Sequence, residues 1–238
     1  MGKMQYNLGR LRSKTHAQQN IVYYRRGYDE VSINLTNRCP NACSFCIRDR
    51  SFGWGFSNLY LDREPSLEEI EDAITGATEK RPEVQVKKFK ICGYGEPMLR
   101  VDILPGLVSF LRETYPISLI QLATTGWSVY HIKKGVENFT DVAKNGLDLV
   151  YLGMHATNFQ DYLRRINPSI DAQVAFDQVI EFIKLAKSLD LKVTCAFVNL
   201  GNLNLEEIKE FVQEIGCEYD IRRFENESSC ESWRNNLL

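Results

Sequence analysis

Three cysteines lie close together in the sequence with the spacing C-x₃-C-x₂-C: Cys39, Cys43 and Cys46. Thiolates are soft ligands that suit iron–sulfur clusters or zinc. A structural zinc ion normally has four protein ligands, and a four-iron cluster normally has four thiolates. No fourth cysteine or histidine lies nearby, since the next histidine is His131. Three thiolates on a four-iron cluster would leave one iron with an open position, and catalytic metal sites keep such a position for a ligand or substrate.

Two other interpretations of the triplet stay open at this point. The cysteines could be ordinary packing residues, or they could bind zinc together with a distant fourth ligand. At this cysteine content, chance would place such a triplet somewhere in the chain in roughly 0.6% of cases. The spacing therefore favours a metal site over packing.

The remaining composition is that of an ordinary globular protein. The 238-residue chain has a formal net charge of −2 and 25% charged residues, which argues against a surface coated in basic residues for nucleic acid. Seven cysteines are an odd number, so a closed disulfide framework is not expected. No apolar run approaches the roughly 18 residues of a membrane span, and the N-terminus lacks the apolar region of a secretory signal. We therefore expect a cytoplasmic protein without a membrane segment.

Strand-like and helix-like segments alternate along the chain. Strands are expected at 21–24, 31–36, 88–92, 117–124, 147–154, 191–198 and 219–224, the first two as a hairpin. Helices are expected after Ser66 and at 102–113, 136–144, 172–189 and 203–215, with Ser66 and Glu69 as a capping box and Gly216 as a C-cap. This alternation predicts an α/β fold with a parallel sheet, either open and doubly wound or a partial barrel.

Polar and glycine-rich segments follow most of the expected parallel strands. In such a fold, sites lie at the C-terminal ends of the strands. The cysteine triplet follows the first parallel strand, and 93–97 (GYGEP) follows the second. Four further segments follow the later strands in turn: 124–126, His155, Asn199 and Glu225. The sequence therefore predicts one site that is assembled from several strand ends.

The triplet, with Phe45 just before its third cysteine, resembles the motif of the radical S-adenosylmethionine (radical SAM) superfamily. The segment 93–97 resembles that superfamily's GGEP segment, and the resemblance extends over about residues 28–226. More narrowly, NLTNRC at 34–39, FCIR at 45–48, CGYGEP at 92–97 and RRF at 222–224 resemble the small TatD-associated radical SAM subfamily. The superfamily resemblance implies a partial (β/α)₆ TIM-like barrel in a single domain with a short N-terminal hairpin and tail.

The resemblance also implies a chemistry. Cys39, Cys43 and Cys46 would ligate a [4Fe–4S] cluster, and S-adenosyl-L-methionine would chelate the fourth iron. Reductive cleavage of the sulfonium would give a 5′-deoxyadenosyl radical that abstracts hydrogen from a substrate, so no protein residue is assigned as catalytic. Cofactor-binding roles are expected for Phe45, Gly93, Tyr94, Gly95, Glu96, Thr124, His155, Asn199 and Arg222. Glu96 is expected to brace its segment rather than transfer protons.

Some positions depart from the superfamily pattern or leave a choice open. Many relatives have Thr-Asn-Gly where this chain has Thr-Thr-Gly at 124–126, and they often have a serine segment where His155 stands. His155 is therefore expected to contact cofactor or substrate, or to be a satisfied histidine at a strand end. Successive strand residues face opposite sides, so only one of Arg222 and Arg223 can point inward, and Arg222 is favoured.

Other positions have a functional and a packing interpretation. The aromatic residues Trp54, Phe56 and Tyr60 would shield the cluster, stack on adenine or simply pack. Cys92 and Cys195 are expected to be small buried residues. Cys217 and Cys230 could bind a second metal, although two thiolates make a poor four-ligand site.

The expected domains are a polar basic tail with the first hairpin strand at 1–27, the barrel at 28–226 and a C-terminal tail at 227–238. The expected partners are an electron donor such as flavodoxin or ferredoxin and an unidentified substrate, either a small molecule or RNA, DNA or protein. The basic tail would be solvated or would touch an anionic partner. The competing hypothesis is a non-catalytic zinc or iron–sulfur adaptor for nucleic acid.

Overall fold

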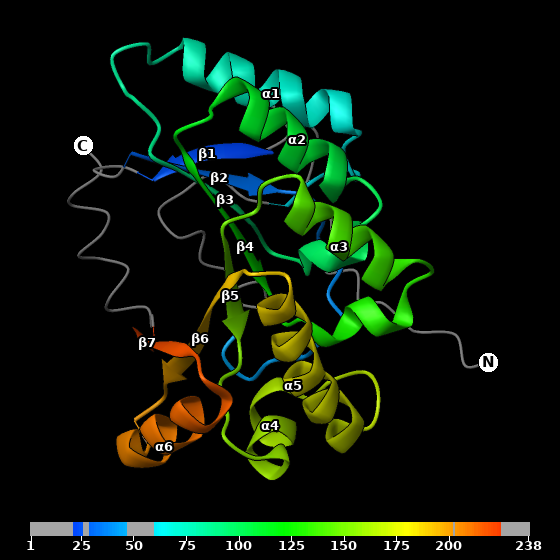
Figure 1. Cartoon of the computed structure of the whole chain (residues 1–238), viewed down its shortest axis with the longest axis vertical. Coiled ribbons are helices and arrows are strands. Elements are labelled where there is room, and N and C mark those ends of the chain that lie inside the picture. Colours follow the sequence, from blue (N-terminus) through cyan, green and yellow to red (C-terminus); the bar gives the residue numbers. More distant parts are fainter. Residues whose placement is uncertain (1–20, 26–28, 47–59, 202, 225–238) are drawn as a thin grey trace.

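The computed structural model describes residues 21–25, 29–46, 60–201 and 203–224. Its centre is a seven-stranded sheet whose spatial order equals its sequence order (Figure 1). The strands are β1 (Val22–Arg25), β2 (Glu30–Asn34), β3 (Lys88–Cys92), β4 (Leu119–Thr124), β5 (Leu149–Gly153), β6 (Lys192–Asn199) and β7 (Glu218–Arg223). β1 pairs antiparallel with β2, and β2 to β7 are parallel. β1 and β7 are the two edges, so the sheet is an open partial barrel, as the resemblance implies.

Helices connect the successive parallel strands, and two of them lie between β5 and β6. They are α1 (Leu67–Glu79), α2 (Leu104–Thr114), α3 (Gly135–Lys144), α4 (Phe159–Ile166), α5 (Ala172–Ser188) and α6 (Leu205–Ile215), with 3₁₀ helices η2 (Pro97–Arg100) and η3 (Trp127–His131). The expected capping box of α1 is present, because Glu69 N donates to Ser66 Oγ and Ser66 N donates to Glu69. Gly216 caps α6 with a φ of 64°, as expected.

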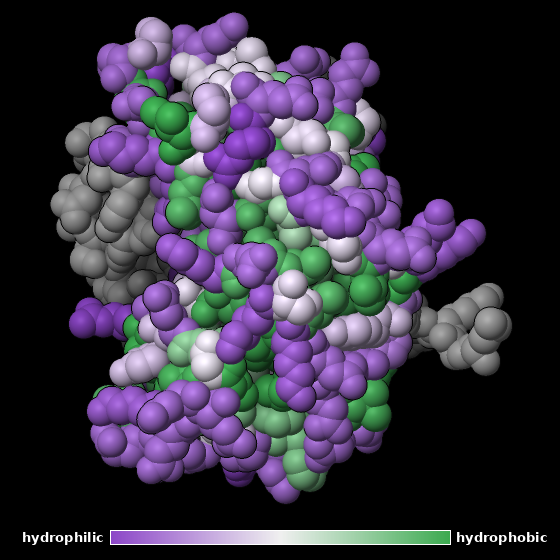
Figure 2. All heavy atoms as spheres, viewed as in Figure 1, coloured by the Kyte–Doolittle hydropathy of each residue, from purple (hydrophilic) through white to green (hydrophobic). Residues whose placement is uncertain are grey.

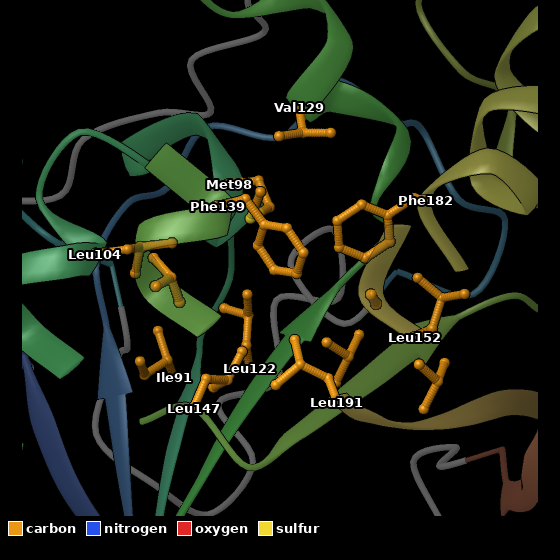
Figure 3. Packing of buried hydrophobic residues seen from close by; sticks show 14 of the residues in the cluster. Ile91, Met98, Leu104, Leu122, Val129, Phe139, Leu147, Leu152, Phe182 and Leu191 are labelled. Carbon is orange, nitrogen blue, oxygen red and sulfur yellow. The ribbon is translucent and has the colours of Figure 1, made fainter. Parts of the chain in front are cut away.

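One face of the sheet packs against the helices and forms the core. Ile91, Leu122 and Leu152 project from neighbouring strands toward Phe139 of α3 and Phe182 of α5 (Figure 3). The two phenyl rings have centroids 4.7 Å apart. On the helix-covered side, hydrophilic side chains cover most of the surface, and hydrophobic side chains are visible between the helices (Figure 2). This packing leaves the opposite, inner face of the sheet for the polar residues described below.

The sequence-based element order is correct, and most bounds agree within two residues. The exceptions are the short helices α4, η2 and η3, which were not expected. Their absence from the prediction follows from their length, since they contain eight, four and five residues and offer little periodicity. No helix in the described part of the chain is long and apolar enough to cross a membrane.

Candidate active site at the strand ends

The cysteine triplet lies in the loop that follows β2, and all three thiols are partly exposed. Cys46 N donates to Cys43 O at 3.0 Å, so the last two cysteines share a tight turn. Among the described residues, no three His, Cys, Asp or Glu side chains are grouped closely enough to hold a single metal ion. The ligands of a four-iron cluster need no such convergence, because each binds a different iron. The donor set and its accessibility therefore fit a cluster.

The cysteine loop is anchored by the C-terminal end of α4. Ala42 N donates to Ile166 O at 3.1 Å, and Ser44 N donates to Arg165 O at 2.9 Å. The buried Asn41 is also fixed from η3, because Trp127 Nε1 donates to Asn41 Oδ1 at 3.2 Å. These bonds hold the ligand-bearing backbone between two elements that lie far away in the sequence.

The glycine segment after β3 packs directly on the chain that leads into the cysteine loop. A Cβ on Gly95 would overlap the carbonyl oxygens of Thr36 and Arg38, and one on Gly93 would overlap Asn34 Oδ1. Gly93 also has a φ of 138°, which side-chain-bearing residues rarely adopt. Glycine is required at both positions, because Gly95 packs against backbone and Gly93 packs against the Asn34 side chain.

Glu96 is fully buried beside this segment and is hydrogen-bonded at both carboxylate oxygens. Oε1 accepts from Thr124 Oγ1 at 2.5 Å and from Met98 N at 3.0 Å. Oε2 accepts from Thr125 N at 2.8 Å and from Thr125 Oγ1 at 2.9 Å. Burial raises the pKa of Glu96, although these donors lower it in part. The carboxylate therefore ties the end of β3 to the end of β4, which is the bracing role expected of it.

His155 follows β5 with a φ of 56°, a left-handed conformation that is uncommon for a non-glycine residue. Its N–H donates to Ala196 O at 3.0 Å, and its Nδ1 accepts from Val198 N at 3.2 Å. Because Nδ1 is an acceptor, the proton of the neutral ring is on Nε2. The ring lies edge-on to Phe45, with the centroids 4.7 Å apart. Two predicted site residues from different strand ends are therefore in contact.

The ring of His155 is held neutral by its surroundings. Burial and, to a smaller extent, the positive charges of Arg222 and Arg165 together lower the pKa of His155 to about 3. The imidazole is therefore a hydrogen-bond donor through Nε2, with no charge of its own near neutral pH. Backbone strain at such a position is a mark of functional sites.

Arg222, and not Arg223, faces the interior of the partial barrel. Tyr151 of β5 donates its hydroxyl proton to Asp220, which lies two residues before Arg222 and on the same side of β7. The Arg222 charge acts on His155 and also on Lys90 of β3, whose side chain is on that side as well. Arg223 therefore points the other way.

The other expected residues occupy less central positions. Tyr94 is buried and packs against Tyr60, with the ring centroids 5.0 Å apart. Asn199 is exposed, and its Oδ1 accepts from Gly201 N at 2.8 Å in the turn after β6. Cys195 is buried as expected, whereas Cys92 and Cys217 are partly exposed. The expectations for Trp54, Phe56, Glu225 and Cys230 lie outside the described residues.

Tyr162 of α4 is a further residue at the site that the sequence reasoning missed. It is fully buried, and burial together with the nearby Cys43 and Glu96 raises the pKa of its phenol well above the ordinary value. The signal in the sequence was the spacing of Phe159, Tyr162 and Ile166 behind Asn158, which caps α4. Recognition of α4 would have placed Tyr162 beside the cysteine loop.

Comparison with known proteins decides the family. The model of the radical SAM superfamily matches residues 33–215, which is most of the chain. This protein belongs to the radical SAM superfamily. Members of this superfamily use a [4Fe–4S] cluster and S-adenosylmethionine as cofactors. The three cysteines fit the cluster, and the glycine segment fits the S-adenosylmethionine. The narrower TatD-associated assignment finds no support in these comparisons.

Among curated radical SAM proteins, the chain is similar to GTP 3',8-cyclases. The protein of Staphylococcus carnosus is 28% identical over 196 residues, covering 77% of this chain and 49% of that protein. The protein of Nautilia profundicola is 25% identical over 197 residues, covering 81% and 54%. The chain thus spans about half the length of the curated relatives that it matches.

Solved structures of superfamily members show the same fold. The FeFe-hydrogenase maturase HydG from Carboxydothermus hydrogenoformans has a TM-score of 0.57 at 13% identity, covering 83% of this chain and 44% of HydG. Methylornithine synthase (PylB) has a TM-score of 0.58 at 14% identity, covering 82% and 53%. At this level of identity the likeness concerns the fold, which confirms the expected partial barrel.

Proposed function

We propose that this protein is a radical SAM enzyme that cleaves S-adenosylmethionine reductively at a [4Fe–4S] cluster and directs the radical to a substrate in the partial barrel. When bound, the two cofactors supply a 5′-deoxyadenosyl radical that abstracts a hydrogen atom. The observation that carries the proposal is the placement of three partly exposed cysteines on one anchored loop, against which the glycine segment 93–97 packs closely.

The chain's own residues would bind and orient the cofactors. Cys39, Cys43 and Cys46 are the proposed ligands, and α4 holds their loop in place. The segment 93–95, packed against the chain that leads into the cysteine loop, is the proposed binding place of the methionine end. His155 offers its Nε2–H at the strand ends. The protein thereby supplies orientation and exclusion of side reactions, while the cofactors carry the chemistry.

The proposal also includes an electron donor, a subfamily and a class of compounds to assay as substrate. A low-potential electron donor such as flavodoxin or ferredoxin would reduce the cluster, and both are proteins of the cytoplasm. The motifs at 34–39 and 222–224 remain the basis for the TatD-associated subfamily as a prediction from the sequence. The substrate of the relatives, GTP by their name, makes nucleotides the first compounds to assay.

The test is anaerobic reconstitution with iron and sulfide, followed by reduction with dithionite in the presence of S-adenosylmethionine. We expect a cluster absorption spectrum and formation of 5′-deoxyadenosine. Cys43→Ala should lose both, whereas Cys217→Ala, which alters a partly exposed thiol outside the triplet, should keep both. Formation of 5′-deoxyadenosine by the Cys43→Ala protein would refute the proposal. One zinc and no sulfide in the purified protein would favour the adaptor instead.

A further inference from the structure

The inner face of the sheet is polar, in contrast to the helix-covered face. In parallel strands, directly paired residues point to the same side, and side chains alternate between the two sides. Lys90 pairs with Ser32 and Gln121, and Tyr151 pairs with Thr194. Between these rows lie the apolar core residues of the other face. The inner face therefore carries a row of polar side chains below the strand ends where the cofactor residues lie, and the space on this side of the sheet is called the lumen here.

Two cationic side chains from different strands, Lys90 and Arg222, lie on this same face of the sheet. Lys90 Nζ of β3 lies 5.1 Å from the ring centroid of Tyr151. Arg222 of β7 is close enough for its charge to act on Lys90. Burial lowers the pKa of Lys90, the charges of Cys92 and Glu30 raise it in part, and the charge of Arg222 lowers it again. Two like charges in a partly desolvated space are unfavourable unless an anion joins them.

The nearby carboxylates are engaged elsewhere. Glu30 Oε2 pairs with Lys88 Nζ at 2.6 Å, and Asp220 accepts the hydroxyl proton of Tyr151. In the part of the chain that the structure describes, neither Lys90 nor Arg222 forms an ion pair with a carboxylate. Neither cation is therefore neutralised by a direct ion pair, although the charges of Cys92 and Glu30 also act on Lys90.

We propose that Lys90 and Arg222 bind a phosphate group of a small-molecule substrate in the lumen of the partial barrel. A phosphate monoester carries about two negative charges at neutral pH and several strong acceptor oxygens, so it matches two cations better than a single carboxylate does. His155 Nε2 lies above Gly153, on the same side of the sheet, and its proton is a further donor. This inference rests on the proposed function, because it names the substrate class of that site.

The experiment is calorimetric titration of inorganic phosphate into the anaerobically reconstituted protein with S-adenosylmethionine present. Acetate and chloride at equal ionic strength are the comparison anions. We expect saturable phosphate binding that Lys90→Met and Arg222→Gln each weaken about tenfold or more, since each removes a charge-assisted contact. Lys90→Arg should retain binding. Arg223→Gln is the matched control, because it removes the same charge from the other side of β7 and should leave the affinity unchanged.

Three outcomes would overturn the proposal. They are the absence of saturable phosphate binding, equal weakening by Arg223→Gln, and tighter binding of acetate than of phosphate, which would assign the site to a carboxylate. A circular dichroism spectrum of each variant shows that it has folded. The titration is also independent of 5′-deoxyadenosine formation. If phosphate binds as expected but no 5′-deoxyadenosine forms, the anion site is supported and the proposed function is wrong. If 5′-deoxyadenosine forms but phosphate does not bind as expected, only the anion site is wrong.

Discussion

The imidazole of His155 lies edge-on against the phenyl ring of Phe45, with the ring centroids 4.7 Å apart. Phe45 belongs to the cysteine loop after β2, and His155 follows β5, so the contact spans the interior of the sheet. It holds the strained backbone of His155 next to the ligand-bearing loop. A substitution at the end of β5 should therefore alter the position of the cysteine loop.

The first prediction concerns the pH dependence of stability. The pKa of His155 is lowered to about 3 in the folded chain, against an ordinary value of 6.5. Between these values the unfolded chain binds the proton and the folded chain does not, so this histidine makes the folded state less stable as the pH falls from 6.5 toward 3. His155→Asn keeps a residue that tolerates positive φ and should flatten the slope by at most about 1.4 kcal/mol per pH unit.

Urea unfolding of the metal-free chain at several pH values measures that slope. His131→Asn, which replaces an exposed histidine on η3, serves as the control. An unchanged slope in the His155→Asn protein would show that the ring titrates normally in the folded state.

The second prediction compares two glycines. Gly95→Ala places a methyl group against the carbonyl oxygens of Thr36 and Arg38, which are backbone atoms and cannot move aside cheaply. Gly76→Ala, in the C-terminal half of α1, meets nothing within 4 Å. The Gly95 variant should have a lower unfolding midpoint and bind less iron on reconstitution. The Gly76 variant should gain up to about 1 kcal/mol of stability from helix propensity. Equal behaviour of the two variants would contradict the close backbone approach.

The third prediction concerns the buried carboxylate of Glu96. Each of its oxygens accepts from a backbone N–H, one from Met98 and one from Thr125. In Glu96→Gln, either orientation of the amide would point its NH₂ group at an N–H donor. We expect a loss of about 1–3 kcal/mol in the free energy of unfolding. Glu210→Gln, on the exposed side of α6, should change it by less than about 0.5 kcal/mol. A Glu96→Gln protein as stable as the wild type would rule out the bracing role.

The fourth prediction concerns the bond between Trp127 and Asn41. Replacement of Trp127 by Phe and of Asn41 by Ala, alone and together, forms a double-mutant cycle. The bond is buried, so we expect a coupling energy of about 0.5–1.5 kcal/mol in urea unfolding. The single variants should also lose iron faster after reconstitution, because the cysteine loop is then held less firmly. A coupling energy near zero would mean that η3 does not help to anchor the loop.

The order of strands and helices could be predicted from the sequence because local signals agree with the final fold. Ser66 and Glu69 fix the start of α1, Gly216 fixes the end of α6, and the apolar periodicity of α5 is long and regular. The cysteine spacing and the glycine segment located the site in the same way. These features depend on residues that are close in sequence, so they can be recognised without knowledge of tertiary contacts.

The remaining features depend on contacts between distant parts of the chain. Alternation along β7 shows that only one of Arg222 and Arg223 faces inward. The hydrogen bond from Tyr151 to Asp220 across the sheet identifies the inward residue as Arg222. The left-handed backbone of His155 is likewise imposed by Ala196 and Val198 of β6. No local pattern encodes either fact.

The order in which the sheet is assembled has a consequence for folding. Each strand pairs only with its neighbours in sequence, so the barrel can grow one β–α unit at a time from its first hairpin. The cysteine loop departs from this order, because the carbonyls of Arg165 and Ile166 that anchor it lie more than a hundred residues later in the chain. Its thiols are made early but immobilised late. The loop can therefore reach its final position only once α4 has formed.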